Sequence, residues 1–186
     1  MPAPSNISPN TGNYQVGKGI VSFKKSGAAT YRDLGNVTSM VITPDMTTLD
    51  HFSSREGVKK KDLTIITEKG LTVKIVMEEY TAENMAMMLL GTVNEAAEGG
   101  PTVQIFDQNE VTGALRFVGT NEVGPQVQVD LWNVSFQPDG DFEVISDEFN
   151  NMEVSGNVLV AGADDVENAG KFGQVQILNI GGGGAS

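Results

Sequence analysis

The residues of this chain that could do chemistry belong to a narrow set of types. The sequence holds 24 Asp and Glu, a single His (His51) and no Cys. Without Cys there are no disulfides, thiolate metal sites or Cys nucleophiles, and a Ser-His-Asp relay or multi-His metal site would have to use His51. Paired carboxylates can cleave glycosides, but nothing in the pattern marks one pair among many. We therefore expect no catalytic residue, no metal site and no cofactor.

Two acidic clusters invite comparison with cation-binding loops. The run DGDFE at residues 139–143 has its Gly second, whereas an EF-hand loop needs Gly at its sixth position. A turn that joins two strands explains this run better. Asp164, Asp165 and Glu167 lie in residues 162–173, which show no strand pattern. That segment predicts a mobile acidic loop, with weak Ca²⁺ binding as the alternative.

The basic residues do not predict a nucleic-acid site. Lys59, Lys60 and Lys61 form one short cluster near Arg55, with no aromatic residue between the lysines. A solvated loop or a protein contact is the better interpretation. The run GKG at residues 17–19 precedes a strand pattern, whereas a phosphate-binding loop needs a helix there. The net charge of −12 also opposes sequence-independent binding to DNA.

The charge is divided unevenly along the chain. Residues 1–90 carry 10 basic and 9 acidic side chains, whereas residues 91–186 carry 2 basic and 15 acidic ones. This excess either keeps the protein soluble or makes one surface negative for something that moves past it. The length of 186 residues predicts one globular domain. No apolar run approaches the roughly 18–20 residues of a membrane span, and residues 1–12 lack a signal-peptide pattern, so we expect folding in the cytosol.

Most of the chain shows the period-two alternation of half-buried strands. The expected strands are 19–24, 37–43, 62–67, 71–78, 102–106, 113–119, 126–136, 141–146, 152–160 and 174–180. Glu68, Lys69 and Gly70 predict a tight turn between the third and fourth of these. The alternation in 126–136 changes phase after Leu131, as at a β-bulge.

One short helix is expected after Tyr80. Thr81 is a good N-cap, Glu83 suits the positive end of the helix dipole, and Gly91 follows Leu90 at the C′ position. Residues 85–90 read MAMMLL, which predicts a helix buried between layers. The fold class is therefore mainly β: an antiparallel β-sandwich or barrel with one short flanking α-helix.

Three segments depart from the strand pattern. Residues 1–16 are rich in Pro, Ser and Asn and predict a flexible N-terminal arm before a β domain at 17–180. Residues 181–186 (GGGGAS) predict a linker, a cloning remnant or a flexible tail. Residues 45–61 predict a long charged loop, which is usually a contact surface or disordered. His51 and Phe52 at its centre predict an anchor on a partner or a local cluster within the loop.

Four ordered segments resemble a known family. They are 17–24 (GKGIVSFK), 31–37 (YRDLGNV), 53–57 (SSREG) and 79–86 (EYTAENMA), the last followed by Leu90 and Gly91. In this order and spacing they resemble the major tail tube proteins of bacteriophages with long, non-contractile tails. The resemblance covers roughly residues 17–91, and the remainder is similar in strand count and composition. It extends to the tube protein of bacterial secretion systems and to the inner tube of contractile tails.

The resemblance implies a structural protein of the virion that assembles in the host cytoplasm. Proteins of this family form hexameric rings whose sheets join into an inner barrel, and the rings stack around a tape measure protein. A tail terminator and tail tip proteins are the other implied partners, and no membrane is involved. DNA passes through the lumen without specific binding, and an acidic wall would repel its phosphates over about 8 Å at physiological salt.

The resemblance also implies a role for the loop at 45–61, because a loop in a similar position reaches the neighbouring ring. The implied inter-ring contact residues are His51, Phe52, Ser53, Ser54, Arg55, Glu56, Gly57, Lys59, Lys60 and Lys61. The alternative function is a monomeric β-sandwich binding module, such as a virion decoration or carbohydrate-binding domain. A glycan site needs exposed aromatic residues, and the single Trp, Trp132, lies in an expected strand.

Overall fold

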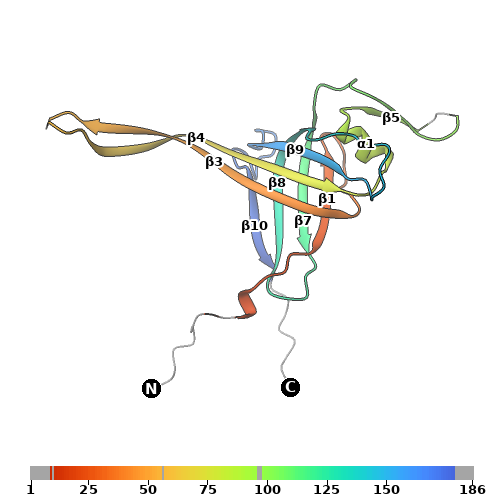
Figure 1. The fold of residues 1–186 in the computed structure, drawn as a ribbon, viewed down its shortest axis with the longest axis horizontal. Helices are drawn as coiled ribbons and strands as arrows, with labels where there is room; N and C mark the ends of the chain where they lie inside the picture. Colours follow the sequence, from red (N-terminus) through yellow and green to blue (C-terminus); the bar gives the residue numbers. More distant parts are fainter. Residues whose placement is uncertain (1–8, 10, 56, 96–97, 179–186) are drawn as a thin grey trace, which may run out of the picture.

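The computed structural model describes residues 9, 11–55, 57–95 and 98–178 (Figure 1). Within these ranges the chain is mainly β with one short helix, which confirms the expected fold class. The expected N-terminal arm lies largely outside the described residues, and the tail at 181–186 lies entirely outside them. Among the described residues, no helix reaches the length and apolarity that a membrane span requires. The elements are η1 (Thr11–Asn13), β1 (Gly19–Lys25), β2 (Arg32–Asp33), β3 (Val37–Ser53), β4 (Lys60–Met77), α1 (Ala82–Met88), β5 (Thr92–Asn94), β6 (Thr102–Gln104), β7 (Val111–Gly119), β8 (Gln126–Pro138), β9 (Met152–Leu159) and β10 (Gly173–Leu178).

Eight strands form one antiparallel sheet that bends over itself. Their order is β2-β1-β7-β8-β9-β4-β3, and β10 also pairs with β8. The first half of β8, residues 126–131, pairs with β10, and its second half, residues 133–138, pairs with β9. In Figure 1, β1, β7, β8 and β10 lie along one common axis as antiparallel neighbours, and β3, β4 and β9 cross them. The sheet therefore makes two layers, as in a sandwich.

A β-bulge in β8 lies where the sheet divides. The register between β7 and β8 shifts by one residue, which places Trp132 and Asn133 opposite a single residue of β7. The extra residue changes which alternate side chains of β8 point toward the core. Leu131 before the bulge and Phe136 after it are consequently both buried, although they are an odd number of residues apart. The phase change expected after Leu131 is confirmed.

The core lies between the two layers. Phe23 of β1 and Phe136 of β8 meet edge to face at its centre, with their ring centroids 5.3 Å apart. The other fully buried large side chains come from β1, β4, β7, β8 and β9, from α1 and from Leu34. None of the core side chains comes from the outer half of β3 or β4. Those parts of the two strands must be stabilised in another way.

Helix α1 closes one end of the core. The Thr81 hydroxyl accepts a 3.1 Å hydrogen bond from the backbone N–H of Asn84, which confirms the expected N-cap. Ala86, Met87 and Met88 are buried, as their apolar run predicts. Asn84 is buried as well, and its amide donates to the carbonyl oxygens of residues 34 and 79.

The helix ends one residue earlier than expected. Leu90, with φ of 47°, occupies the left-handed C′ position that was assigned to Gly91. Gly91 follows it and donates a 2.7 Å hydrogen bond to the carbonyl of Ala86. A Cβ at Gly91 would overlap the carbonyl oxygen of Gln104. Glycine is therefore needed here for close packing of two backbones and not for a positive φ.

Three predictions of local structure are wrong. Residues 141–146 form no strand, because no neighbouring strand pairs with them and Val144 and Ile145 stay exposed. Glu68, Lys69 and Gly70 form no turn and lie inside β4. Residues 45–61 do not form a long loop, since 45–53 continue β3 and 60–61 begin β4. The two strands stay paired from Asp45 with Gly70 out to Ser53 with Lys60, and the turn lies beyond Ser53.

Candidate functional site

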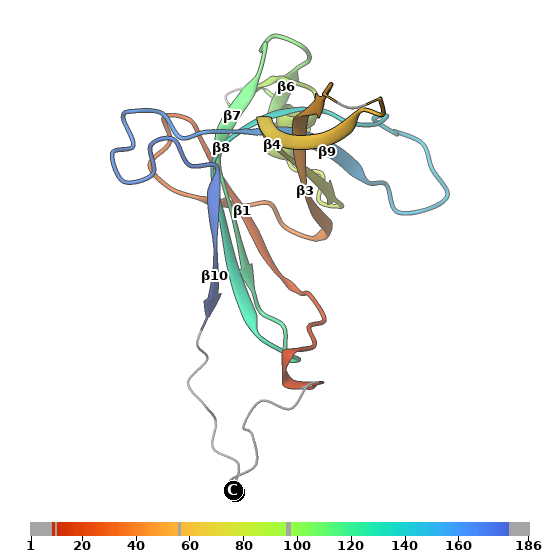
Figure 2. The ribbon, with the colours of Figure 1, turned by 90° about the vertical axis from the view of Figure 1, so that its left-hand side faces the viewer.

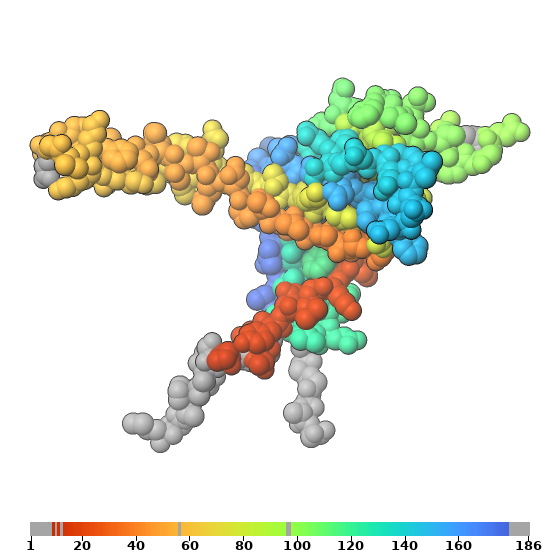
Figure 3. Space-filling view, viewed as in Figure 1, coloured from red at the N-terminus to blue at the C-terminus, as the bar shows by residue number. Residues whose placement is uncertain are grey.

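The most unusual feature of the molecule is the outer part of the β3–β4 hairpin, residues 45–70, which we call the arm. β3 and β4 pair along their whole length, whereas β9 pairs with β4 only from Thr72 to Met77. The arm therefore leaves the body as a two-stranded ribbon (Figures 1 and 3). Isolated two-stranded ribbons are only marginally stable in water. An arm of this length is typical of a segment that gains a partner.

Apolar side chains lie along the arm without being buried. Leu49 of β3 and Ile65 of β4 are opposite each other, and 59% and 46% of their surfaces are exposed. The other exposed large apolar residues of the arm are Met46, Phe52, Val58, Leu63 and Ile66. Large exposed apolar side chains concentrated on one projecting segment are typical of a contact site.

Polar contacts cross the outer half of the arm. His51 Nδ1 lies 2.6 Å from Asp62 Oδ1, and Lys61 Nζ lies 2.7 Å from Asp50 Oδ2. Thr64 Oγ1 donates a 2.7 Å hydrogen bond to Asp50 Oδ1. The hydrogen bond from Lys61, and then that from Thr64, lower the pKa of Asp50. Exposed pairs of this kind contribute little stability, so their effect is to fix the local register.

The arm gathers the expected contact residues at its far end. His51, Phe52 and Ser53 close β3, while Lys60 and Lys61 open β4. Ser54, Arg55, Gly57 and Lys59 lie in the turn between the strands, and Glu56 lies outside the described residues. All of the described ones are exposed except Ser53, which is half-buried. The structure thus brings these residues together on one projecting tip, and their contact role stays a prediction.

Strand β10 has a free edge. Within the described residues it pairs with β8 alone. The backbone N–H of Trp132 donates to the carbonyl of Phe172, so alternate residues counted from Phe172 turn their backbone groups toward β8. Val175 and Ile177 therefore turn theirs toward the free edge, and 69% and 65% of their surfaces are exposed. The sequence predicts this strand, but nothing in it identifies the strand as an edge.

Strand β1 has a partly free edge at the opposite margin of the same layer. The short strand β2 pairs only with Ser22 and Phe23. Leu34 N–H adds one 2.9 Å hydrogen bond to the carbonyl of Val21. The beginning of β1 has no second strand beside it in the described part of the chain, and Ile20 is exposed there. Free strand edges are templates for pairing with another chain.

The outer face of this layer is polar and centres on Asp130. The side chain of Asp130 is 1% exposed and accepts hydrogen bonds from Arg116 Nε at 2.6 Å, Gln128 Nε2 at 2.8 Å and Gln174 Nε2 at 3.3 Å. Burial alone would raise the pKa of Asp130, but these hydrogen bonds and the charge of Arg116 outweigh it and lower the pKa. The carboxylate is therefore ionised and neutralised by Arg116.

Glutamines complete that face, which we call the glutamine face. Gln126, Gln128 and Gln174 lie on it with Gln176, in register across β8 and β10. Among the described residues of β1, β7, β8 and β10, Asp130 is the one carboxylate on this face, and Asp33 of the short strand β2 continues the same row beyond Ser22. Most of the acidic side chains of the second half of the chain lie instead in the loops at 139–151 and 162–170.

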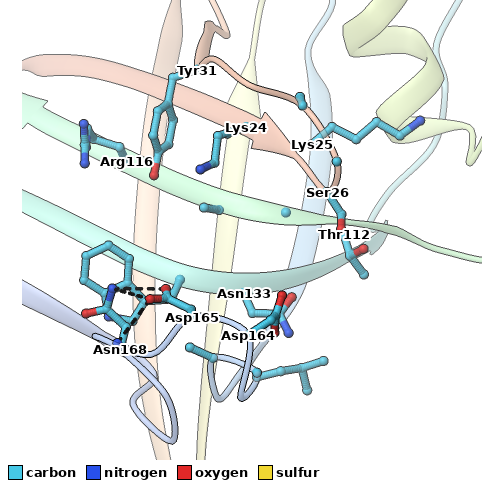
Figure 4. A pocket seen from close by; sticks show the side chains of 18 of the residues that line it. Lys24, Lys25, Ser26, Tyr31, Thr112, Arg116, Asn133, Asp164, Asp165 and Asn168 are labelled. Atoms are coloured by element: carbon cyan, nitrogen blue, oxygen red, sulfur yellow. Dashed lines mark hydrogen bonds between the residues drawn. The ribbon is translucent and has the colours of Figure 1, made fainter.

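A groove of about 680 Å³ opens beside this face, between residues 24–31 and the loop at 162–170 (Figure 4). The Arg116 guanidinium carbon lies 4.6 Å from the centroid of the Tyr31 ring, and Lys24 Nζ lies 5.4 Å from it. Burial is the main cause of the raised pKa of Tyr31. The indole N–H of Trp132 is buried without a hydrogen-bond partner in the described part of the chain. These groups can stack on or hydrogen-bond a ligand.

The acidic loops do not gather ligands for a cation. Asp139 and Glu153 lie 3.3 and 2.6 Å from Lys74 Nζ, which pairs with both and compensates one of their two charges. Asp165 accepts hydrogen bonds from the amide of Asn168. Within the described residues, no group of three or more His, Asp or Glu side chains could hold a metal ion.

Comparison with known proteins gives one family. The model of a family described as "Protein of unknown function UCP028589" matches residues 14–102 and 98–176. The matched ranges include β1 and the whole arm. A search of curated proteins found no match.

Proposed function

We propose a function for the chain, which belongs to the family of unknown function UCP028589: it is a structural protein that assembles into the stacked rings of a bacteriophage tail tube. The resemblance of residues 17–91 to major tail tube proteins motivates the proposal. The observation that carries it is the arm, a long uncovered ribbon with apolar side chains exposed along it. Contact with another copy would cover this ribbon and bury its apolar side chains.

The two free edges support ring formation. β10 and the beginning of β1 lie at opposite margins of the layer β1-β7-β8-β10. If the β10 edge of one copy pairs with the β1 edge of the next, the layers of six copies close into a continuous barrel and no edge remains. Burial of Val175 and Ile177 in that joint stabilises the ring.

The glutamine face suits the wall of the lumen. The Asp130 carboxylate and the Arg116 guanidinium neutralise each other, and the polar groups around them on β8 and β10 are amides. Amide groups carry no net charge, so they neither attract nor repel DNA phosphates strongly. In this proposal, amides line the barrel instead of the carboxylates expected from the acidic composition. DNA then passes without specific binding.

The arm supports stacking of the rings. It extends away from the layer that would form the barrel, and its tip carries the contact residues expected from the sequence. Contact with a neighbouring ring would bury its exposed apolar side chains. The tape measure protein, a terminator and the tail tip are the other proposed partners, in the virion and during assembly in the host cytoplasm.

Substitution of Val175 by Pro tests the edge pairing. Proline removes the N–H that Val175 turns toward the free edge and leaves the hydrogen bonds to β8 in place. Sedimentation velocity over a concentration series should show multimers for the wild type and monomers for Val175→Pro. The matched control Val175→Thr retains the N–H and should assemble. Multimers of Val175→Pro like those of the wild type would overturn edge pairing, and a wild type that stays monomeric would overturn the whole proposal.

A further inference from the structure

The loop at residues 139–151, between β8 and β9, has an exposed apolar centre. Ile145 is 90% exposed, Phe149 is 93% exposed and Val144 is 74% exposed, which are among the highest values for large apolar side chains in the described residues. The loop also carries five carboxylates and no basic side chain. Its surface therefore combines apolar groups with a negative rim.

Specific contacts hold this loop against the body. The ring of Tyr80 stacks on Phe142 with their centroids 5.8 Å apart, and the Tyr80 hydroxyl donates to the carbonyl of Glu143 at 3.2 Å. The amide of Asn150 donates to the same carbonyl at 2.9 Å. A hollow of about 530 Å³ lies beside these contacts, lined by Val144, Ile145, Phe149 and the carboxylates of Glu78 and Glu148 among others. The apolar side chains are thus displayed around a hollow by a loop that is anchored.

The tip of the arm has the complementary character. Residues 54–61 carry four basic side chains and one acidic one. Val58, at the centre of the tip, is 74% exposed and lies between Arg55 and Lys59, which are exposed as well. An apolar centre with a positive rim matches the apolar centre and negative rim of the loop.

The tip and the loop lie on opposite sides of one molecule. In Figure 1 the arm extends to the left, while the loop lies on the right of the body. Figure 2, viewed from the left, shows the arm toward the viewer and the loop projecting to one side. The tip of an arm that points away from its own loop cannot reach that loop, so a contact between tip and loop would join two copies. Contacts of this head-to-tail kind continue from copy to copy and build stacks.

We propose that the tip of the arm binds the loop at 139–151 of a second copy of this chain, with Val58 in the hollow beside Phe149 and Ile145. Arg55 and Lys59 then face the carboxylates of Asp147 and Glu148. The inference rests on the proposed function and identifies the acceptor surface of the stacking contact. Because the rim contacts are charged and exposed, stacking should weaken as salt is raised.

A charge exchange tests the pairing. Arg55→Glu with Lys59→Glu makes the tip acidic, and Asp147→Lys with Glu148→Lys makes the loop basic. Each double variant alone should need at least about tenfold more protein to form stacks, because like charges then meet. A 1:1 mixture of the two double variants should stack again, and so should the quadruple variant. Recovery in the mixture excludes misfolding as the cause of the loss.

A matched control changes the same charge elsewhere. Asp164→Lys with Glu167→Lys alters the other acidic loop and should stack like the wild type. Stacking measured by electron microscopy and sedimentation separates the outcomes. If the wild type forms no multimers, the proposed function fails. If the wild type stacks and the tip variant stacks equally well, or if neither the mixture nor the quadruple variant recovers, or if the control also loses stacking, this inference is overturned while the proposed function stands.

Discussion

Arg116 Nε lies 2.6 Å from Oδ1 of Asp130, an ionised carboxylate that is 1% exposed on the strand beside it. Gln128 and Gln174 donate to the other carboxylate oxygen, so neighbouring strands converge on one charge. Removal of one member of a buried pair leaves the other group unsatisfied. We expect Asp130→Asn to lower the free energy of unfolding by about 1–3 kcal/mol in urea titrations at pH 7.

The same variant should show a characteristic pH dependence. Because the pKa of Asp130 is lowered in the folded state, its contribution to stability is present above the pKa of the unfolded carboxyl, near 4, and is lost as the pH falls through the folded pKa. The stability difference between wild type and Asp130→Asn should therefore shrink below about pH 4. Asp164→Asn, at an exposed carboxylate, is the control and should change stability little. A difference that persists unchanged at lower pH would contradict the ionised pair.

Removal of the helix cap gives a second prediction. The Thr81 hydroxyl accepts the N–H of Asn84, which has no partner within the helix. Thr81→Ala should lower the free energy of unfolding by about 1 kcal/mol, whereas Thr81→Ser, which retains the hydroxyl, should lower it less. Thermal unfolding followed by circular dichroism measures both. Equal losses for Ala and Ser would show that the hydroxyl does not cap the helix.

Gly91 gives a third prediction, on packing. A Cβ at this position would overlap the carbonyl oxygen of Gln104, which belongs to the backbone and cannot move alone. Gly91→Ala should cost about 1–3 kcal/mol of stability because the β6 segment or the helix must shift. Gly57→Ala at the arm tip is the control, since nothing lies within 4 Å of its Cβ position. A change of similar size at both positions would disprove the close approach.

Replacement of the arm gives a fourth prediction. Asp45 and Gly70 are opposite each other, so Asn-Gly in place of residues 46–69 should close the shortened hairpin with a tight turn. Residues 46–69 contribute nothing to the core, so the free energy of unfolding should change by less than about 1 kcal/mol. Stacks should disappear while single rings remain. Normal stacks from the shortened chain would contradict the role of the arm, and a large loss of stability would show that the arm supports the fold.

Much of the fold follows from local sequence signals. Period-two alternation predicts most strands of the body, the phase change after Leu131 predicts the bulge, and Thr81 predicts the start of the helix. Each of these signals depends on residues close together in the sequence, and each is strong because one side of the element is buried. Residues 141–146 alternate as well, but no strand lies beside them to pair with, so this local signal alone does not produce a strand.

The arm shows why the remainder could not be predicted. A ribbon that is exposed on both faces does not alternate cleanly, so charged residues such as Asp50 and Lys61 read as a loop although they pair across two strands. Glu68 to Gly70 read as a turn for the same reason. The free edge of β10 depends on which strands are absent beside it, and that is a property of the whole topology.

Negative-stain electron microscopy of the purified chain over a concentration and salt series tests the central claim most directly. The account predicts rings with six-fold symmetry that stack into hollow tubes as concentration rises. Particles of single-subunit size at every concentration and salt would contradict it and favour a monomeric binding module.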